Sequence, residues 1–167
     1  YIHLFDGGLS ENLGLNEVLM AFEALKVAPD ETVIPALSRA KKVVIISVNA
    51  LRFPEVDWDT YPVPPDTDSL LGQMWSIPVD RISLDTVEQV REKVTAWQAD
   101  APGRQGYVVP VTFDRLKDPE ERLFFRRVKT RMTLPEEQIV RLRETAGRLL
   151  RESPSFQRLL ADLNGKK

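Results

Sequence analysis

The residues best placed to do chemistry lie at the start of the chain, where an apolar run of strand length ends at Asp6. Gly7 and Gly8 follow, and then a polar turn that includes Ser10 and Asn12. In open α/β sheets, functional groups gather where strands end and loops begin. The two glycines let the backbone turn sharply and let another group approach closely, because they have no Cβ. A carboxylate in this place has acid–base chemistry open to it; in the plainer interpretation, Asp6 only begins an Asx-type turn.

Other common catalytic and metal-binding sets are incomplete in the sequence. The only histidine, His3, lies inside the apolar run, and strand alternation points it away from the face of Asp6, so we expect a structural role for it. There is no cysteine, which excludes disulfides, thiolate metal ligands and a cysteine nucleophile. No serine is flanked by glycines in the Gly-x-Ser-x-Gly pattern. Asp57-Trp58-Asp59 lacks the spacing of a calcium loop, so we expect an acidic loop, no metal site and no cofactor.

The segment from Tyr1 to Leu15 resembles the catalytic-aspartate segment of the patatin-like phospholipases. The residues that carry the resemblance are Asp6-Gly7-Gly8 and, behind them, Ser10-Glu11-Asn12-Leu13-Gly14-Leu15. The C-terminal portion, from Lys129-Thr130-Arg131 to Ser153-Pro154-Ser155-Phe156, is also similar to the tail of bacterial members.

This resemblance implies the C-terminal part of a three-layer α/β/α hydrolase domain that uses a Ser-Asp dyad. Asp6 would be the general base, taking the serine proton without a histidine between them. The serine nucleophile and the Gly-rich oxyanion loop would lie upstream of Tyr1 in a longer parent protein. The implied substrate is a lipid or another acyl ester, and the implied parent is bacterial and membrane-associated. The 167-residue chain alone is then expected to show no esterase activity.

The elements that must position Asp6 occupy residues 1–50, which we expect to be the end of the α/β domain. One apolar face, spaced as in a helix, runs over residues 15–25, with Asn12 as a plausible cap. Residues 41–48 form a continuous apolar, β-branched run, which predicts a strand covered on both faces. Strand, helix and strand in this order predict a parallel βαβ unit.

Residues 51–167 are expected to form a Pro-rich loop and a mainly helical region. The apolar patch around residues 70–75 is expected to be core, and a helix is expected to start at Ser83 or Asp85. Pro110 predicts an edge or bulged strand over residues 107–113, because proline cannot donate to a sheet ladder. Phe124 and Phe125 lie on a charged helix. Two helices then follow the prolines 135 and 154.

The charge distribution bears on partners. The formal net charge is −2, so we expect no nucleic-acid partner. Residues 114–167 carry fourteen Lys and Arg against nine Asp and Glu, and residues 1–113 carry nine against sixteen. The basic tail suits a phospholipid surface, although a solvated helical face with mixed ion pairs is the favoured interpretation. A non-catalytic lipid-surface or protein-interaction module is the alternative function, and uncovered sheet and helix surfaces predict self-association.

Overall fold

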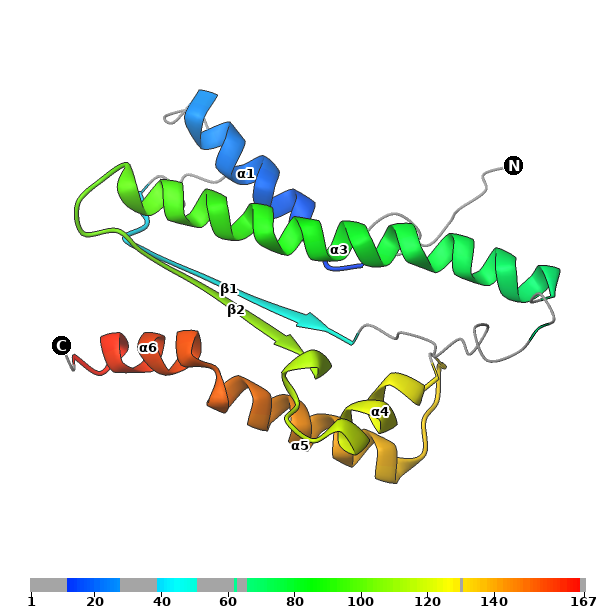
Figure 1. Cartoon of the computed structure of the whole chain (residues 1–167). Coiled ribbons are helices and arrows are strands. Elements are labelled where there is room, and N and C mark those ends of the chain that lie inside the picture. The colour runs from blue at the N-terminus through cyan, green and yellow to red at the C-terminus, as the bar shows by residue number, and fades with distance from the viewer. Residues whose placement is uncertain (1–11, 28–38, 51–61, 63–65, 130, 166–167) are drawn as a thin grey trace. The chain divides into compact units, whose positions relative to one another are not determined.

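The computed structural model describes residues 12–27, 39–50, 62, 66–129 and 131–165. These residues form a mixed α/β structure with a small parallel sheet of two strands (Figure 1). The elements, in chain order, are α1 (Leu15–Val27), β1 (Lys42–Asn49), α3 (Thr67–Ala99), β2 (Gln105–Thr112), the 3-10 turn η2 (Phe113–Arg115), α4 (Pro119–Arg127), α5 (Glu136–Glu152) and α6 (Pro154–Leu163). The strand and the Asp-Gly-Gly turn predicted before α1 lie outside the described residues, as does most of the predicted Pro-rich loop.

The chain divides into two compact units, which we describe separately. The first unit consists of the described residues within 1–44 and 57–108. It contains α1, α3 and the first residues of both strands. The second unit consists of those within 45–56 and 109–167, and contains the ends of both strands and all later helices.

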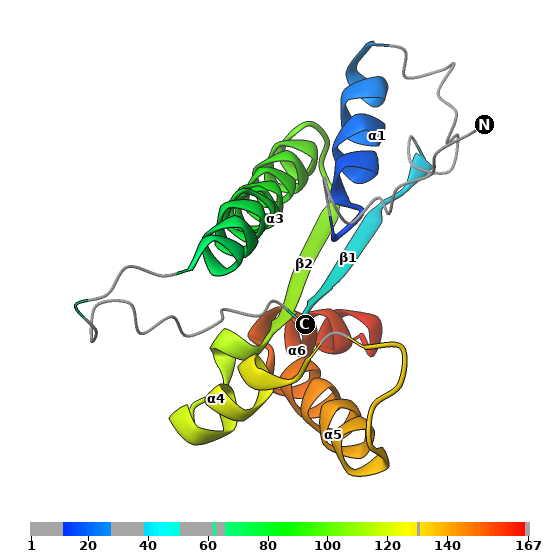
Figure 2. The same ribbon diagram turned by 90° about the vertical axis from the view of Figure 1, so that its right-hand side faces the viewer.

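The sheet comes from a β1–α3–β2 connection. The two strands lie side by side in both views, and their arrowheads lie at the same end (Figures 1 and 2). The amide of Gln105 donates to the carbonyl of Lys41 at 2.8 Å where the pairing begins. Parallel neighbours need such a long crossover, normally through a helix. The prediction that residues 41–48 form a strand is confirmed. The βαβ unit seen here, however, joins this strand to β2. The first strand of the unit predicted over residues 1–48 lies outside the described residues.

The prediction that this strand is covered on both faces is wrong for the described residues. The side chains of Val44, Ile46 and Val48 are 42%, 46% and 64% exposed, whereas Ser47 is buried. In β2, by contrast, residues of both faces are buried, including Tyr107, Val108 and Val109. Hydrophobic sequence alone gives the strand, but the elements packed on each face decide its burial. Within the described residues the edge position predicted from Pro110 is confirmed, because β2 pairs there only with β1.

In the first unit, α1 packs along α3 (Figure 1). The rings of Phe22 and Trp97 meet edge to face at 6.5 Å, and Lys93 forms an ion pair with Glu23 beside them. Leu15 and Phe22 are buried, as the helical spacing of residues 15–25 predicts. On α3 the buried face continues through Val90 and Val94 to Trp97. These contacts fix α1, and with it the chain that follows Asn12.

Two expectations for α3 are wrong. The helix begins at Thr67, ahead of the predicted start at Ser83 or Asp85, and continues through Pro78. The apolar patch near its start is not core, because Leu70, Leu71 and Met74 are 39%, 58% and 69% exposed. Ser83, one of the two predicted start positions, lies within the buried face of the helix.

Gly106 allows β2 and α3 to approach closely within the first unit. A Cβ at this position would lie 2.2 Å from Cγ1 of Val94, which is itself buried and branched at Cβ. We therefore expect Gly106→Ala to lower the free energy of unfolding by about 1–3 kcal/mol through overpacking. In urea unfolding, the double variant Gly106→Ala/Val94→Ala should lose less free energy of unfolding than the sum of the losses in the two single variants.

A matched change tests the cause. Gly147 lies in α5, where an added Cβ would meet only the mobile end of Arg151 at 3.2 Å. Gly147→Ala should raise the free energy of unfolding by about 0.5–1 kcal/mol, because alanine favours the helix. Equal effects of the two glycine changes, or simple additivity of Gly106→Ala with Val94→Ala, would contradict the steric explanation.

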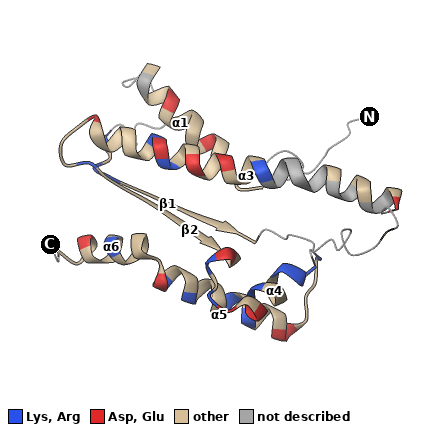
Figure 3. Ribbon diagram, viewed as in Figure 1, with Lys and Arg blue, Asp and Glu red and all other residues tan. Residues whose placement is uncertain are grey.

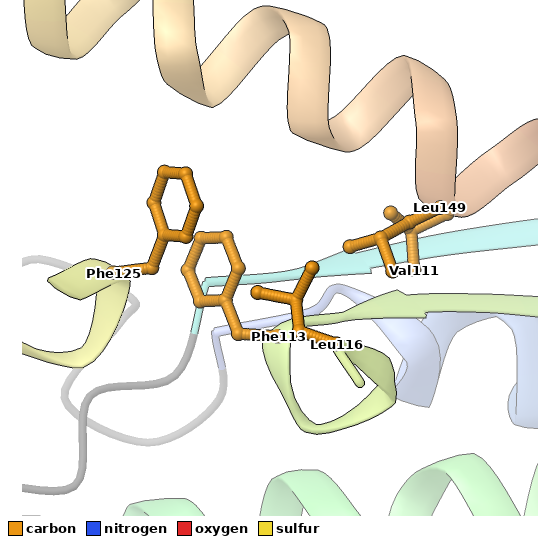
Figure 4. Packing of buried hydrophobic residues seen from close by; sticks show 5 residues of the cluster. All are labelled: Val111, Phe113, Leu116, Phe125 and Leu149. Atoms are coloured by element: carbon orange, nitrogen blue, oxygen red, sulfur yellow. The ribbon is translucent and has the colours of Figure 1, made fainter. Parts of the chain in front are cut away.

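The second unit has an aromatic core (Figure 4). Phe113 and Phe125 stack with ring centroids 4.8 Å apart, and Phe124 meets Phe125 edge to face at 5.1 Å. Val111, Leu116 and Leu149 complete the buried cluster. The core thus joins the end of β2 to η2, α4 and α5.

Polar contacts hold α4 and α5 in this unit. Asp118 caps α4 by accepting from the Glu120 amide at 3.0 Å, with Pro119 in the first turn. Arg148 of α5 donates to Glu121 of α4 at 2.6 Å. This hydrogen bond is the main cause that raises the pKa of Arg148 above its ordinary value; the nearby charges of Glu121 and Glu152 raise it further. Figure 3 shows Lys and Arg mixed with Asp and Glu along these helices, in line with the mixed ion pairs expected of the basic tail.

Candidate functional site

The predicted site residues fall mostly outside the described part of the chain. Asp6, Gly7, Gly8 and Ser10 are not among the described residues. Asn12 is described and exposed, in a bend three residues before α1 begins. Asp6 as general base therefore stays a prediction.

Gly14 explains part of the sequence signal behind Asn12. Its φ is +64°, in the left-handed region, and it lies directly before α1. A side chain there strains the backbone, whereas glycine does not. Leu15 then begins the helix and is buried at 5% exposure. The sequence Leu13-Gly14-Leu15 thus turns the chain abruptly into α1.

The described residues contain an apolar pocket at the carboxyl ends of the two parallel strands. It has a volume of about 160 Å³ and belongs wholly to the second unit. Its walls come from the end of β1, the end of β2 and one face of α5: Val48, Asn49, Ala50, Val111, Thr112, Phe113, Leu142, Ala146 and Leu149. In open α/β sheets this end of the strands is where ligands bind.

The pocket is suited to binding and not to acid–base chemistry. None of its lining residues is titratable, and the surface it presents is apolar. The hydroxyl of Thr112 accepts from the Asp114 amide at 3.5 Å, so it serves the start of η2. A volume of about 150 Å³ is enough to hold a molecule the size of benzene. A short acyl chain or an aromatic ring fits this space.

Ala146 offers a direct test of the pocket. Ala146→Leu should fill it, because the change adds three carbons to its α5 wall. In methyl NMR spectra, benzene should shift the signals of Val111 and Leu149 in the unsubstituted chain and not in this variant. Ala161→Leu makes the same change on α6, away from this pocket, and should leave the shifts in place. Benzene shifts that persist in Ala146→Leu would place the apolar probe elsewhere.

Sequence reasoning missed this pocket because its walls are distant in the chain. Val48, Val111 and Leu142 each lie in a separate element, and nothing in the spacing of one element indicates the others. The rule that ligands bind where parallel strands end could have indicated the pocket. It was used for Asp6, and it holds equally for Asn49 and Thr112 at the ends of the two described strands.

The described residues show no membrane-crossing element and no metal-binding cluster. No helix in this part of the chain is long and apolar enough to span a bilayer. Among the same residues, no group of three His, Cys, Asp or Glu side chains is arranged to hold a metal ion.

Comparison of the chain with family models, with curated proteins and with solved structures gives no match.

Proposed function

We propose that this chain is part of a serine lipid acyl hydrolase of the patatin-like kind, with Asp6 as its general base. The observation that carries the proposal is the motif Asp6-Gly7-Gly8 with Ser10-Glu11-Asn12-Leu13-Gly14-Leu15 behind it. The described end of this motif supports it, because Gly14 has the left-handed backbone and Leu15 the buried helix start that such a turn into a helix requires.

In the proposed reaction a serine hydroxyl outside this chain attacks the ester carbonyl. Its proton passes to the carboxylate of Asp6, and collapse of the tetrahedral intermediate expels the alcohol, which takes a proton as it leaves. Water then attacks the acyl-serine in the same way and releases the acid. An aspartate of ordinary pKa, about 4, is a weak base for a serine, so the site must be partly dry and the oxyanion strongly stabilised.

The apolar pocket supports a substrate with an apolar group. The pocket follows the carboxyl ends of β1 and β2, where ligands bind in open α/β sheets. An acyl chain gains roughly 0.8 kcal/mol per methylene buried, so even a small pocket favours acyl esters over acetate-like substrates.

The proposal is tested on the whole protein that contains this chain. A fluorophosphonate probe should label one serine, and short-chain esters and phospholipids should be hydrolysed. The 167-residue chain alone should be neither labelled nor active. A folded whole protein that is neither labelled nor active would overturn the proposal.

A second candidate is a non-catalytic lipid-surface or protein-interaction module. The observation that favours it is the exposed patch of Leu70, Leu71 and Met74 at the start of α3. Apolar side chains gathered in this way on a surface commonly mark a contact site. A whole protein without labelling or turnover, but with binding to lipid vesicles, would favour this candidate.

A further inference from the structure

A second pocket of the second unit is built differently from the apolar one. Its volume is about 420 Å³, and its walls come from the end of η2, the residues after it and the junction of α5 with α6. The lining residues are Arg115, Lys117, Leu149, Glu152, Ser153 and Gln157. The pocket therefore combines two cations, one carboxylate and polar groups at the start of a helix.

Ser153 is the unusual member of this set. It precedes α6 in the N-cap position and is only 2% exposed, yet it makes no side-chain capping bond. Its Oγ has no hydrogen-bond partner among the described residues. Buried hydroxyls are nearly always hydrogen-bonded, so an unused hydroxyl in a pocket wall indicates a partner from outside the chain.

The start of α6 adds to the same side of the pocket. The first amides of a helix have no partner within it, and they carry a partial positive charge equivalent to about half an elementary charge. Pro154 supplies no amide, and the amide of Gln157 already bonds to the Ser153 carbonyl at 2.9 Å. The Gln157 side chain donates to the Arg151 carbonyl at 3.1 Å, which holds it at the helix start.

The charges of the pocket favour an anion. In the described part of the chain, neither Arg115 nor Lys117 forms an ion pair, and both are exposed at the pocket. Glu152 is the one carboxylate in the wall, and its charge also acts on Arg148. Two cations and a helix N-terminus against one carboxylate leave a positive pocket.

From this arrangement we propose that the pocket binds a phosphate group. A phosphate monoester carries nearly two negative charges and several acceptor oxygens, which match a guanidinium fork, an ammonium, a hydroxyl and helix amides. The site is independent of Asp6 chemistry, since it uses none of the residues proposed for hydrolysis.

The test uses the full 167-residue chain and inorganic phosphate, followed by calorimetry and by amide NMR of Ser153 and Gln157. Ser153→Ala should weaken phosphate binding about fivefold, and Arg115→Gln or Lys117→Gln about tenfold, the usual range for losing a neutral or a charged hydrogen bond. Glu152→Gln should tighten it, because the opposing charge is removed. Lys129→Gln removes an exposed lysine of the same unit that lies outside this pocket, and it should leave binding unchanged.

The stability of Ser153→Ala separates binding from helix capping. Because the hydroxyl makes no capping bond, its removal should leave the unfolding temperature equal or higher while phosphate binding falls. A lower unfolding temperature with unchanged phosphate binding would show a structural role and overturn the proposal. Absence of phosphate binding to the folded chain would also overturn it.

A second arm identifies the source of the phosphate. Vesicles of phosphatidylcholine with phosphatidic acid are compared with vesicles of phosphatidylcholine alone. Binding only to the former, competed by inorganic phosphate and weakened by Lys117→Gln, would assign a lipid headgroup. Binding of inorganic phosphate without vesicle binding would assign a soluble phosphate. Vesicle binding that is insensitive to the pocket variants would contradict the site.

Discussion

Replacing Asp6 by asparagine is expected to lower ester turnover of the whole protein by about 10²–10⁴, the usual contribution of a general base. Asparagine keeps the size and shape of the side chain but does not accept a proton at neutral pH. The serine would still be held near the ester, so the loss should fall on kcat more than on KM. Ester hydrolysis and circular dichroism measured side by side on both proteins make the comparison.

The control for this change is Asp100→Asn, an identical substitution at an exposed residue just after α3. It should hydrolyse esters at the unsubstituted rate. Wild-type turnover in a folded Asp6→Asn protein would show that Asp6 is not the base. Strong fluorophosphonate labelling of the Asp6→Asn protein, equal to that of wild type, would equally count against its role in activating the serine.

Replacing Phe125 by alanine is expected to lower the free energy of unfolding of the second unit by about 3–5 kcal/mol. The ring is 1% exposed and contacts both Phe113 and Phe124, so its loss leaves a cavity and removes two aromatic contacts. Urea unfolding followed by far-ultraviolet circular dichroism measures the change. The slope of the free energy of unfolding against urea concentration should be the same in both proteins.

Phe124→Ala gives a comparison within the same helix. Phe124 is partly exposed, and the guanidinium of Arg141 lies 3.7 Å from its ring centre. This variant removes less buried area and one cation–π contact, and it should cost less than half as much. Equal losses for the two variants would mean that the stacked pair in Figure 4 does not govern the stability of this unit.

The elements that depend on local sequence could be predicted well. The spacing of Leu15 and Phe22 gave the buried face of α1, and the apolar run before Asn49 gave β1. Pro135 and Pro154, which predicted two helix starts, lie at or next to the starts of α5 and α6. In each case the deciding interactions lie within a few residues.

The features that depend on distant residues could not be predicted. The apolar run predicted that Val44, Ile46 and Val48 are buried, but they are exposed. A strand's own sequence does not show whether another element packs on that face. The predicted start of α3, at Ser83 or Asp85, is too late, because the helix begins at Thr67 and continues through Pro78. The two pockets each draw on three or more segments, so neither shows in the spacing of any one of them. The assignment of Asp6 comes from the motif alone and stays a prediction.

The crossover between β1 and β2 has a consequence for how the protein is made. β1 begins at Lys42 and its partner at Gln105, so β1 emerges from the ribosome well before β2 exists. At roughly 5–20 residues per second, the delay is about 3–13 s. During that time the valines and isoleucines of β1 have no partner strand within the described part of the sheet, and a collapsed or aggregated nascent chain competes with pairing. Slower translation of residues 50–104, or the loss of chaperones that bind short apolar segments, should therefore lower the soluble yield without changing the stability of the finished fold.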